Sequence, residues 1–88
     1  MNKKIFNINK ESIILDLEAI LGVYIEKTYD HYGSMTCNLI VLLGNKVSEP
    51  QKITLYLGYR SYNESKITYI GDVKNMYEYL IDHFTKKE

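Results

Sequence analysis

The sequence predicts a two-layer α+β fold of the order αββββα, in which a four-stranded antiparallel meander sheet carries an N-terminal and a C-terminal helix on one face. Two observations carry this prediction. Apolar residues recur at helical spacing near both ends of the chain, and between these segments they alternate with a period of two. With 88 residues, the chain is expected to form a single domain over residues 1–88.

Residues 10–21 are expected to form the first helix, because their apolar side chains follow a helical stripe. Asn9 suits the N-cap of this helix and Gly22 suits its C-cap. Ahead of it, the apolar residues between 5 and 8 fit either a short extra strand or an irregular lead-in, and both alternatives stay open. The stripe consists of Ile13, Ile14, Leu17, Ile20 and Leu21.

Four strands are expected after Gly22, where the apolar period changes to two. Consecutive strands joined by short turns should pair antiparallel, and turn residues separate all four segments. The longest loop is expected over residues 44–51. The predicted strands cover residues 23–28, 35–43, 52–60 and 67–69.

The last helix is expected from Asp72 to Phe84, with Asp72 as its N-cap. Its apolar stripe should pack on the same sheet face as the first helix. This stripe consists of Val73, Met76, Tyr77, Leu80, Ile81 and Phe84.

Charge and cysteine content narrow the functional classes. Eleven basic residues balance eleven acidic ones, so the chain lacks the strong positive charge of a general nucleic-acid binder. Cys37 is the only cysteine, which excludes an internal disulfide and favours the reduced cytoplasm. The longest apolar run, residues 39–43, is far shorter than the roughly 20 residues that span a bilayer, so a soluble protein without membrane contact is expected.

The residues that could carry chemistry are few. His31 and His83 are the only histidines, and no cluster of Cys, His and carboxylate residues has the spacing of a metal site. Cys37 shares the strand parity of core residues, where a cysteine acts as a small buried hydrophobic residue. The sequence therefore predicts a protein that is not an enzyme and has no catalytic residue, cofactor or metal.

The sheet face opposite the helices is the candidate binding surface. Aromatic residues and arginine are enriched where proteins bind each other, and this face is expected to combine them with aliphatic side chains. Tyr32 and Tyr62 are expected nearby, in turns. An alternative is that the aliphatic residues of this face pack beneath the N-terminal segment or against a second copy of the chain. The candidate partner-binding residues are Tyr24, Ile40, Leu42, Tyr56, Arg60, Tyr32 and Tyr62.

Nine tyrosines accompany two phenylalanines and no tryptophan. Tyrosine is common at recognition surfaces, although an AT-rich codon composition also explains the excess. Strand parity and the helical stripe assign Tyr29, Tyr59, Tyr69 and Tyr77 to the core. Five others are expected on the open face, in turns or on the outer side of the last helix: Tyr24, Tyr32, Tyr56, Tyr62 and Tyr79.

These features predict a small, non-enzymatic protein-binding module that acts by occluding or bridging a partner. Its size and composition are typical of phages and mobile elements, so an inhibitor of a bacterial host defence complex, similar to an anti-CRISPR protein, is one specific form. A single-stranded nucleic-acid-binding module that uses Tyr24, Tyr56 and Arg60 for stacking, with Lys52 and Lys66 near the phosphates, is the alternative. A homodimeric structural protein is the third.

Overall fold

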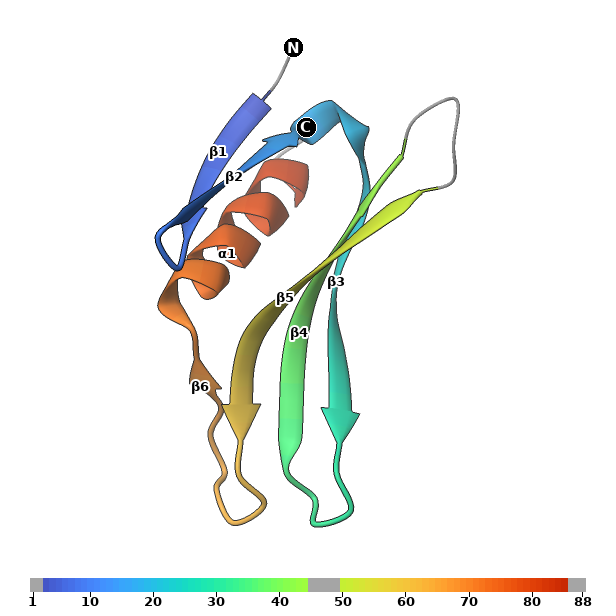
Figure 1. Cartoon of the computed structure of the whole chain (residues 1–88). Coiled ribbons are helices and arrows are strands. Elements are labelled where there is room, and N and C mark those ends of the chain that lie inside the picture. Colours follow the sequence, from blue (N-terminus) through green and yellow to red (C-terminus); the bar gives the residue numbers. More distant parts are fainter. Residues whose placement is uncertain (1–2, 45–49, 86–88) are drawn as a thin grey trace.

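Strands make up most of the fold, and a single long helix follows them (Figure 1). The computed structural model describes residues 3–44 and 50–85. The elements, in chain order, are β1 (Lys3–Ile8), β2 (Glu11–Asp16), the short 3-10 helix η1 (Leu17–Ala19), β3 (Ile20–Tyr29), β4 (Met35–Leu43), β5 (Gln51–Arg60), β6 (Thr68–Tyr69) and α1 (Gly71–Thr85).

The predicted N-terminal helix over residues 10–21 is wrong, and with it the αββββα order. β1 and β2 form a two-stranded antiparallel sheet, in which Lys3 lies opposite Asp16 and Ile8 opposite Glu11. The two residues between these strands, Asn9 and Lys10, have φ angles of 52° and 68°. Positive φ at both central positions is the geometry of a two-residue type I′ hairpin turn, which asparagine favours.

The spacing of the apolar residues explains why this segment is compatible with the predicted helix and also with the strand in the structure. Ile13, Leu15 and Leu17 alternate with a period of two, and Leu15 is 2% exposed while the intervening Ile14 is 60% exposed. The strand also has a partner, because residues 5–8 form the extra strand that the sequence left open. The β-branched Ile13 and Ile14 favour an extended backbone over a helix.

The antiparallel meander is confirmed. The second sheet has the strand order β3-β4-β5-β6, and each strand is antiparallel to its neighbour. β4 covers the predicted residues 35–43, and β5 extends the prediction by Gln51 alone. The predicted loop over residues 44–51 includes residues 45–49, which lie outside the described part of the chain.

A β-bulge interrupts the pairing of β4 with β5. Cys37 lies opposite Gly58, whereas the next residue, Asn38, lies opposite Tyr56, so Leu57 has no partner of its own. The extra residue reverses the side-chain parity beyond it. Gly58 fits the close approach of β6, since a Cβ atom there would lie 2.7 Å from the Thr68 carbonyl oxygen.

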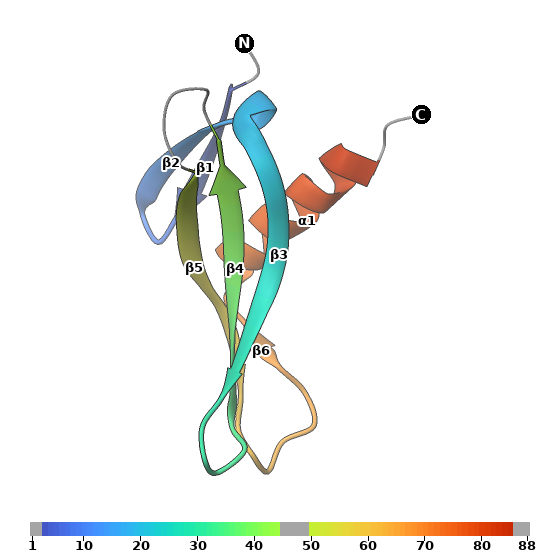
Figure 2. The same ribbon diagram turned by 90° about the vertical axis from the view of Figure 1, so that its right-hand side faces the viewer.

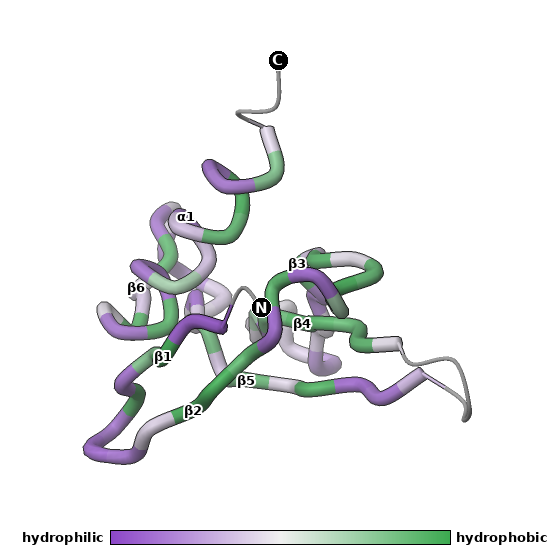
Figure 3. Tube along the Cα trace, turned by 90° about the horizontal axis from the view of Figure 1, so that it is seen from above, coloured by the Kyte–Doolittle hydropathy of each residue, from purple (hydrophilic) through white to green (hydrophobic). Residues whose placement is uncertain are grey.

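The hairpin and α1 lie together on one side of the four-stranded sheet (Figures 1 and 3). They share one core with the facing strands, because Phe6 and Leu15 of the hairpin belong to the same buried cluster as Leu39 of β4 and Leu80 of α1. The rest of this cluster is Leu17, Met35, Cys37, Val41, Leu57, Val73 and Met76. We call this side of the sheet the covered face.

The predicted C-terminal helix is confirmed, but its N-cap is not Asp72. The Ile70 carbonyl accepts a hydrogen bond from the Lys74 amide at 2.9 Å, which places the cap at Ile70. Asp72 lies in the first turn, and its Oδ2 atom accepts a hydrogen bond from the Asn9 amide at 3.3 Å. This carboxylate therefore links the hairpin turn to the start of the helix. α1 is neither long nor apolar enough to cross a membrane, and the rest of the described chain contains no helix that could.

Substitution at Leu15 should distinguish the strand seen in the structure from the helix that the sequence predicts for this segment. Leu15→Ala should lower the free energy of unfolding by about 2–5 kcal/mol, because it leaves a cavity in the shared core. Ile14→Ala is the matched control, since Ile14 points to solvent, and should change it by less than about 0.5 kcal/mol. Urea denaturation measures both. Equal losses at the two positions would contradict the hairpin.

Gly58 should be intolerant of a side chain. Gly58→Ala should lower the free energy of unfolding by about 1–3 kcal/mol, since the added methyl group would displace the backbone of β6. Gly71→Ala is the control, because a Cβ atom at Gly71 meets no heavy atom within 4 Å and alanine favours the helix. Thermal unfolding should show a lower midpoint for Gly58→Ala and an unchanged or higher one for Gly71→Ala.

Candidate functional site

The sheet face opposite the hairpin and α1 is the candidate site, and we call it the open face. None of the described helices or strands crosses it (Figures 1 and 3). Its cross-strand rows follow from the pairing register. From one end to the other, they are Gly22–Leu42–Lys52, Tyr24–Ile40–Thr54, Glu26–Asn38–Tyr56 and Thr28–Thr36–Tyr59–Thr68.

Ile40 forms the centre of the open face. It is 0% exposed although it lies outside the buried cluster of the covered face. Tyr24 lies directly opposite it on β3 and Thr54 on β5, while Tyr56 lies on the diagonal. Ile40 is therefore buried by its own neighbours on the sheet.

Three tyrosines of the open face remain accessible, of which Tyr24 and Tyr56 flank Ile40 and Tyr59 lies farther along the face, opposite Thr36. Tyr24 is 43% exposed, Tyr56 is 49% exposed and Tyr59 is 40% exposed. Each ring presents apolar area and a hydroxyl group at little cost in side-chain entropy, which suits binding to another protein. Leu42 lies at one end of the same face and is half-buried.

The bulge at Leu57 corrects two assignments. Tyr59, expected in the core, lies on the open face opposite Thr36. Arg60, expected on the open face, lies on the covered side opposite Met35, and its Nε atom is buried without a hydrogen-bond partner in the described structure. The signal was present in the sequence, because an isolated glycine inside a strand, here Gly58, indicates a bulge.

Two further core assignments are wrong. Tyr29 lies on the covered side of β3 but is 61% exposed, because it is the last residue of its strand. Tyr69 is 41% exposed, and the Lys74 ammonium group lies 4.9 Å from its ring centroid. Tyr77 is half-buried against the core, as predicted.

Tyr32 and Tyr62 lie at the end of the sheet, away from Ile40. The β3–β4 turn is held by Asp30, whose Oδ1 atom accepts hydrogen bonds from the Tyr32 and Ser34 amides at 2.9 and 3.0 Å. Gly33 completes the turn with a φ angle of 93°. Ser34 Oγ accepts a hydrogen bond from the Tyr62 amide at 3.1 Å, which joins this turn to the β5–β6 turn. The structure thus divides the candidate residues into an open-face group and a turn group.

The charges of the open face are few and opposite in sign. Among the described residues, Glu26 and Lys52 are the only formally charged ones in its cross-strand rows, so these rows do not form the positively charged groove of a nucleic-acid-binding surface. Arg60 lies on the other side of the sheet from Tyr24 and Tyr56. The three residues therefore do not form the joint stacking surface that the nucleic-acid alternative requires.

The groups that could carry catalysis are separated. Cys37 is 1% exposed within the core, as expected for a small buried hydrophobic residue. The His31 ring packs against that of Tyr32 in the turn, and the His83 ring stacks on that of Tyr79 on α1. Within residues 3–44 and 50–85, no three His, Cys, Asp or Glu side chains gather in a group that could hold a metal ion.

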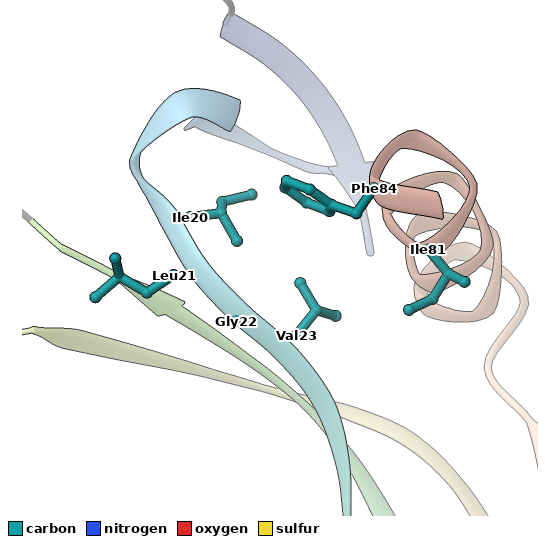
Figure 4. Close-up of a pocket in the computed structure, with 6 residues that line it drawn as sticks. All are labelled: Ile20, Leu21, Gly22, Val23, Ile81 and Phe84. Carbon is teal, nitrogen blue, oxygen red and sulfur yellow. The ribbon is translucent and has the colours of Figure 1, made fainter. Parts of the chain in front are cut away.

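Two hollows flank the layer formed by the hairpin and the helix. One has a volume of about 280 Å³ and lies between β1 and α1, beside Tyr79, whose ring lies 4.7 Å from the Lys4 ammonium group. The other has a volume of about 270 Å³ and lies between the start of β3 and the end of α1 (Figure 4). Its lining is apolar and consists of Ile20, Leu21, Gly22, Val23, Ile81 and Phe84.

Comparison with models of protein families, with curated proteins and with solved structures found no match for this chain.

The open-face tyrosines should contribute little to stability compared with the buried Ile40. Tyr56→Ala should lower the free energy of unfolding by less than about 1 kcal/mol, because Tyr56 is half-exposed. Ile40→Ala should lower it by about 2–5 kcal/mol, because it empties a fully buried position. Urea denaturation of both variants checks this contrast. A larger loss for Tyr56→Ala would indicate that the tyrosine serves packing.

Proposed function

We propose that the protein is a small, non-enzymatic binding module whose open face binds a protein partner. The observation that supports this most directly is the accessibility of Tyr24 and Tyr56 beside the fully buried Ile40, with Tyr59 accessible farther along the same face. Accessible aromatic side chains on a well-packed apolar base are the features of interface residues that dominate binding energy. The nearly neutral charge of the face suits a protein better than a phosphate backbone.

The frame beneath the tyrosines supports the same function. Tyr24 and Tyr56 project from adjacent positions on either side of β4, and β4 is held by pairing on both of its edges. Because strand pairing already orders the backbone that carries these side chains, binding requires little further ordering of the backbone. The module would act by covering the surface of its partner, which requires no chemistry from the chain itself.

Site-specific photo-crosslinking tests this proposal. A photoreactive phenylalanine analogue at Tyr56 should link the protein to a defined partner in cell extract, whereas the same analogue at Glu78, on the exposed side of α1, should not. Tyr56→Ala and Tyr59→Ala should then weaken binding of the purified partner by roughly tenfold or more.

Tyr62→Ala is the matched control, because Tyr62 is 66% exposed but belongs to the turn group. It should leave the affinity unchanged. If Tyr62→Ala weakens binding and Tyr56→Ala does not, the partner binds the turn end and the proposed face is wrong.

A further inference from the structure

The outer edge of β3 is unpaired over a long stretch. β3 contains 10 residues and, among the described strands, pairs with β4 alone (Figures 1 and 2). Every second residue of such an edge directs its amide and carbonyl groups outward, where another strand can bind them. On the opposite side of the sheet, β6 has only two residues and pairs with Gly58 and Tyr59 of β5.

One end of this edge lies beside an apolar pocket, and the other end carries an exposed aromatic side chain. At the start of β3 lies the apolar pocket between Val23 and Phe84, with a volume of about 270 Å³ (Figure 4). An apolar cavity of about 150 Å³ is enough for a benzene ring. At the end of β3, Tyr29 projects from the covered side of the sheet and is 61% exposed.

Antiparallel pairing of β3 with a second copy brings these two ends together. If a two-fold axis passes through Ile25, residues between 22 and 28 whose numbers add to 50 lie opposite each other. Tyr29 then lies across from Leu21, which lines the pocket and belongs to the bulge between Ile20 and Gly22. Four residues separate each of these positions from the axis, which corresponds to about 14 Å of strand. The contact forms twice, once on each side of the axis.

The charges of β3 fit the same register. Glu26 lies opposite Tyr24, and Lys27 lies opposite Val23, so no like charges face each other. A shift by one pleat in one direction places Glu26 opposite Glu26. The shift in the other direction places Tyr29 opposite Ala19, which precedes the first residue of β3.

We propose that two copies of the chain pair antiparallel through β3 about Ile25, and that Tyr29 of each copy occupies the apolar pocket of the other. The sheet then continues across the axis, and the two open faces lie on the same side of it. This inference does not depend on the proposed function, since the edge of β3 and the open face are different surfaces.

Disulfide trapping tests the register. Opposite residues of antiparallel strands have Cα atoms about 4.5–5.5 Å apart, which suits a disulfide. Ile25→Cys should therefore form a covalent dimer under mild oxidation, and a mixture of Tyr24→Cys and Glu26→Cys proteins should form a covalent heterodimer. Thr28→Cys is the matched control, because the two copies of this exposed residue would lie about 20 Å apart.

Light scattering during size-exclusion chromatography tests whether the protein is a dimer and whether Tyr29 stabilises it through the pocket. The unmodified protein should show a dimer mass that falls on dilution, and Tyr29→Ala should raise the dimer dissociation constant roughly tenfold or more. Tyr32→Ala should not change it, because this equally exposed tyrosine lies in the turn. A monomer mass at all concentrations, or equal trapping through Thr28→Cys, would overturn the proposal. Circular dichroism confirms that each variant is folded.

Discussion

The fold depends on one shared hydrophobic core that no element could complete alone. A two-stranded hairpin is marginal by itself in water, and a four-stranded sheet needs a cover for at least one face. Phe6 and Leu15 of the hairpin meet Leu39 and Leu80 in a single buried cluster. The hairpin and α1 both cover this face of the sheet, so no other described helix or strand covers the opposite face. The accessibility of the tyrosines on the open face follows from this division.

The meander and the final helix could be predicted from the sequence because their signals do not compete. In β4, apolar and polar residues alternate up to Leu39 and a continuous apolar run follows, as is typical of a central strand, and turn residues mark the end of β3 and both ends of β5. The N-terminal segment differs, because Ile13 to Leu17 fit the start of a helical stripe and also the alternation of a strand. Asn9 favours an N-cap and a type I′ turn alike. Only the contact of β2 with β1 and with the core selects the strand.

The candidate site was predictable in composition but not in all its members. Strand parity placed Tyr24, Ile40 and Tyr56 together, since the register there is regular. Beyond Leu57 the parity reverses, so Tyr59 joins the open face and Arg60 leaves it. A bulge adds one residue without any change in the apolar pattern, and parity alone cannot place it. The turn tyrosines required knowledge of which loops meet, which the hydrogen bond between Ser34 and Tyr62 reveals.

The connectivity also bears on how the chain folds. Every strand pair joins neighbours in sequence, so each needs only a short loop to close, and such topologies fold fast. The hydrogen bond from the Asn9 amide to Asp72 is different, because it joins residues 63 positions apart. Its two partners meet only when α1 docks on the hairpin. Since α1 also carries Val73, Met76 and Leu80 into the shared core, neither sheet has its full packing until the C-terminal segment of the chain has docked.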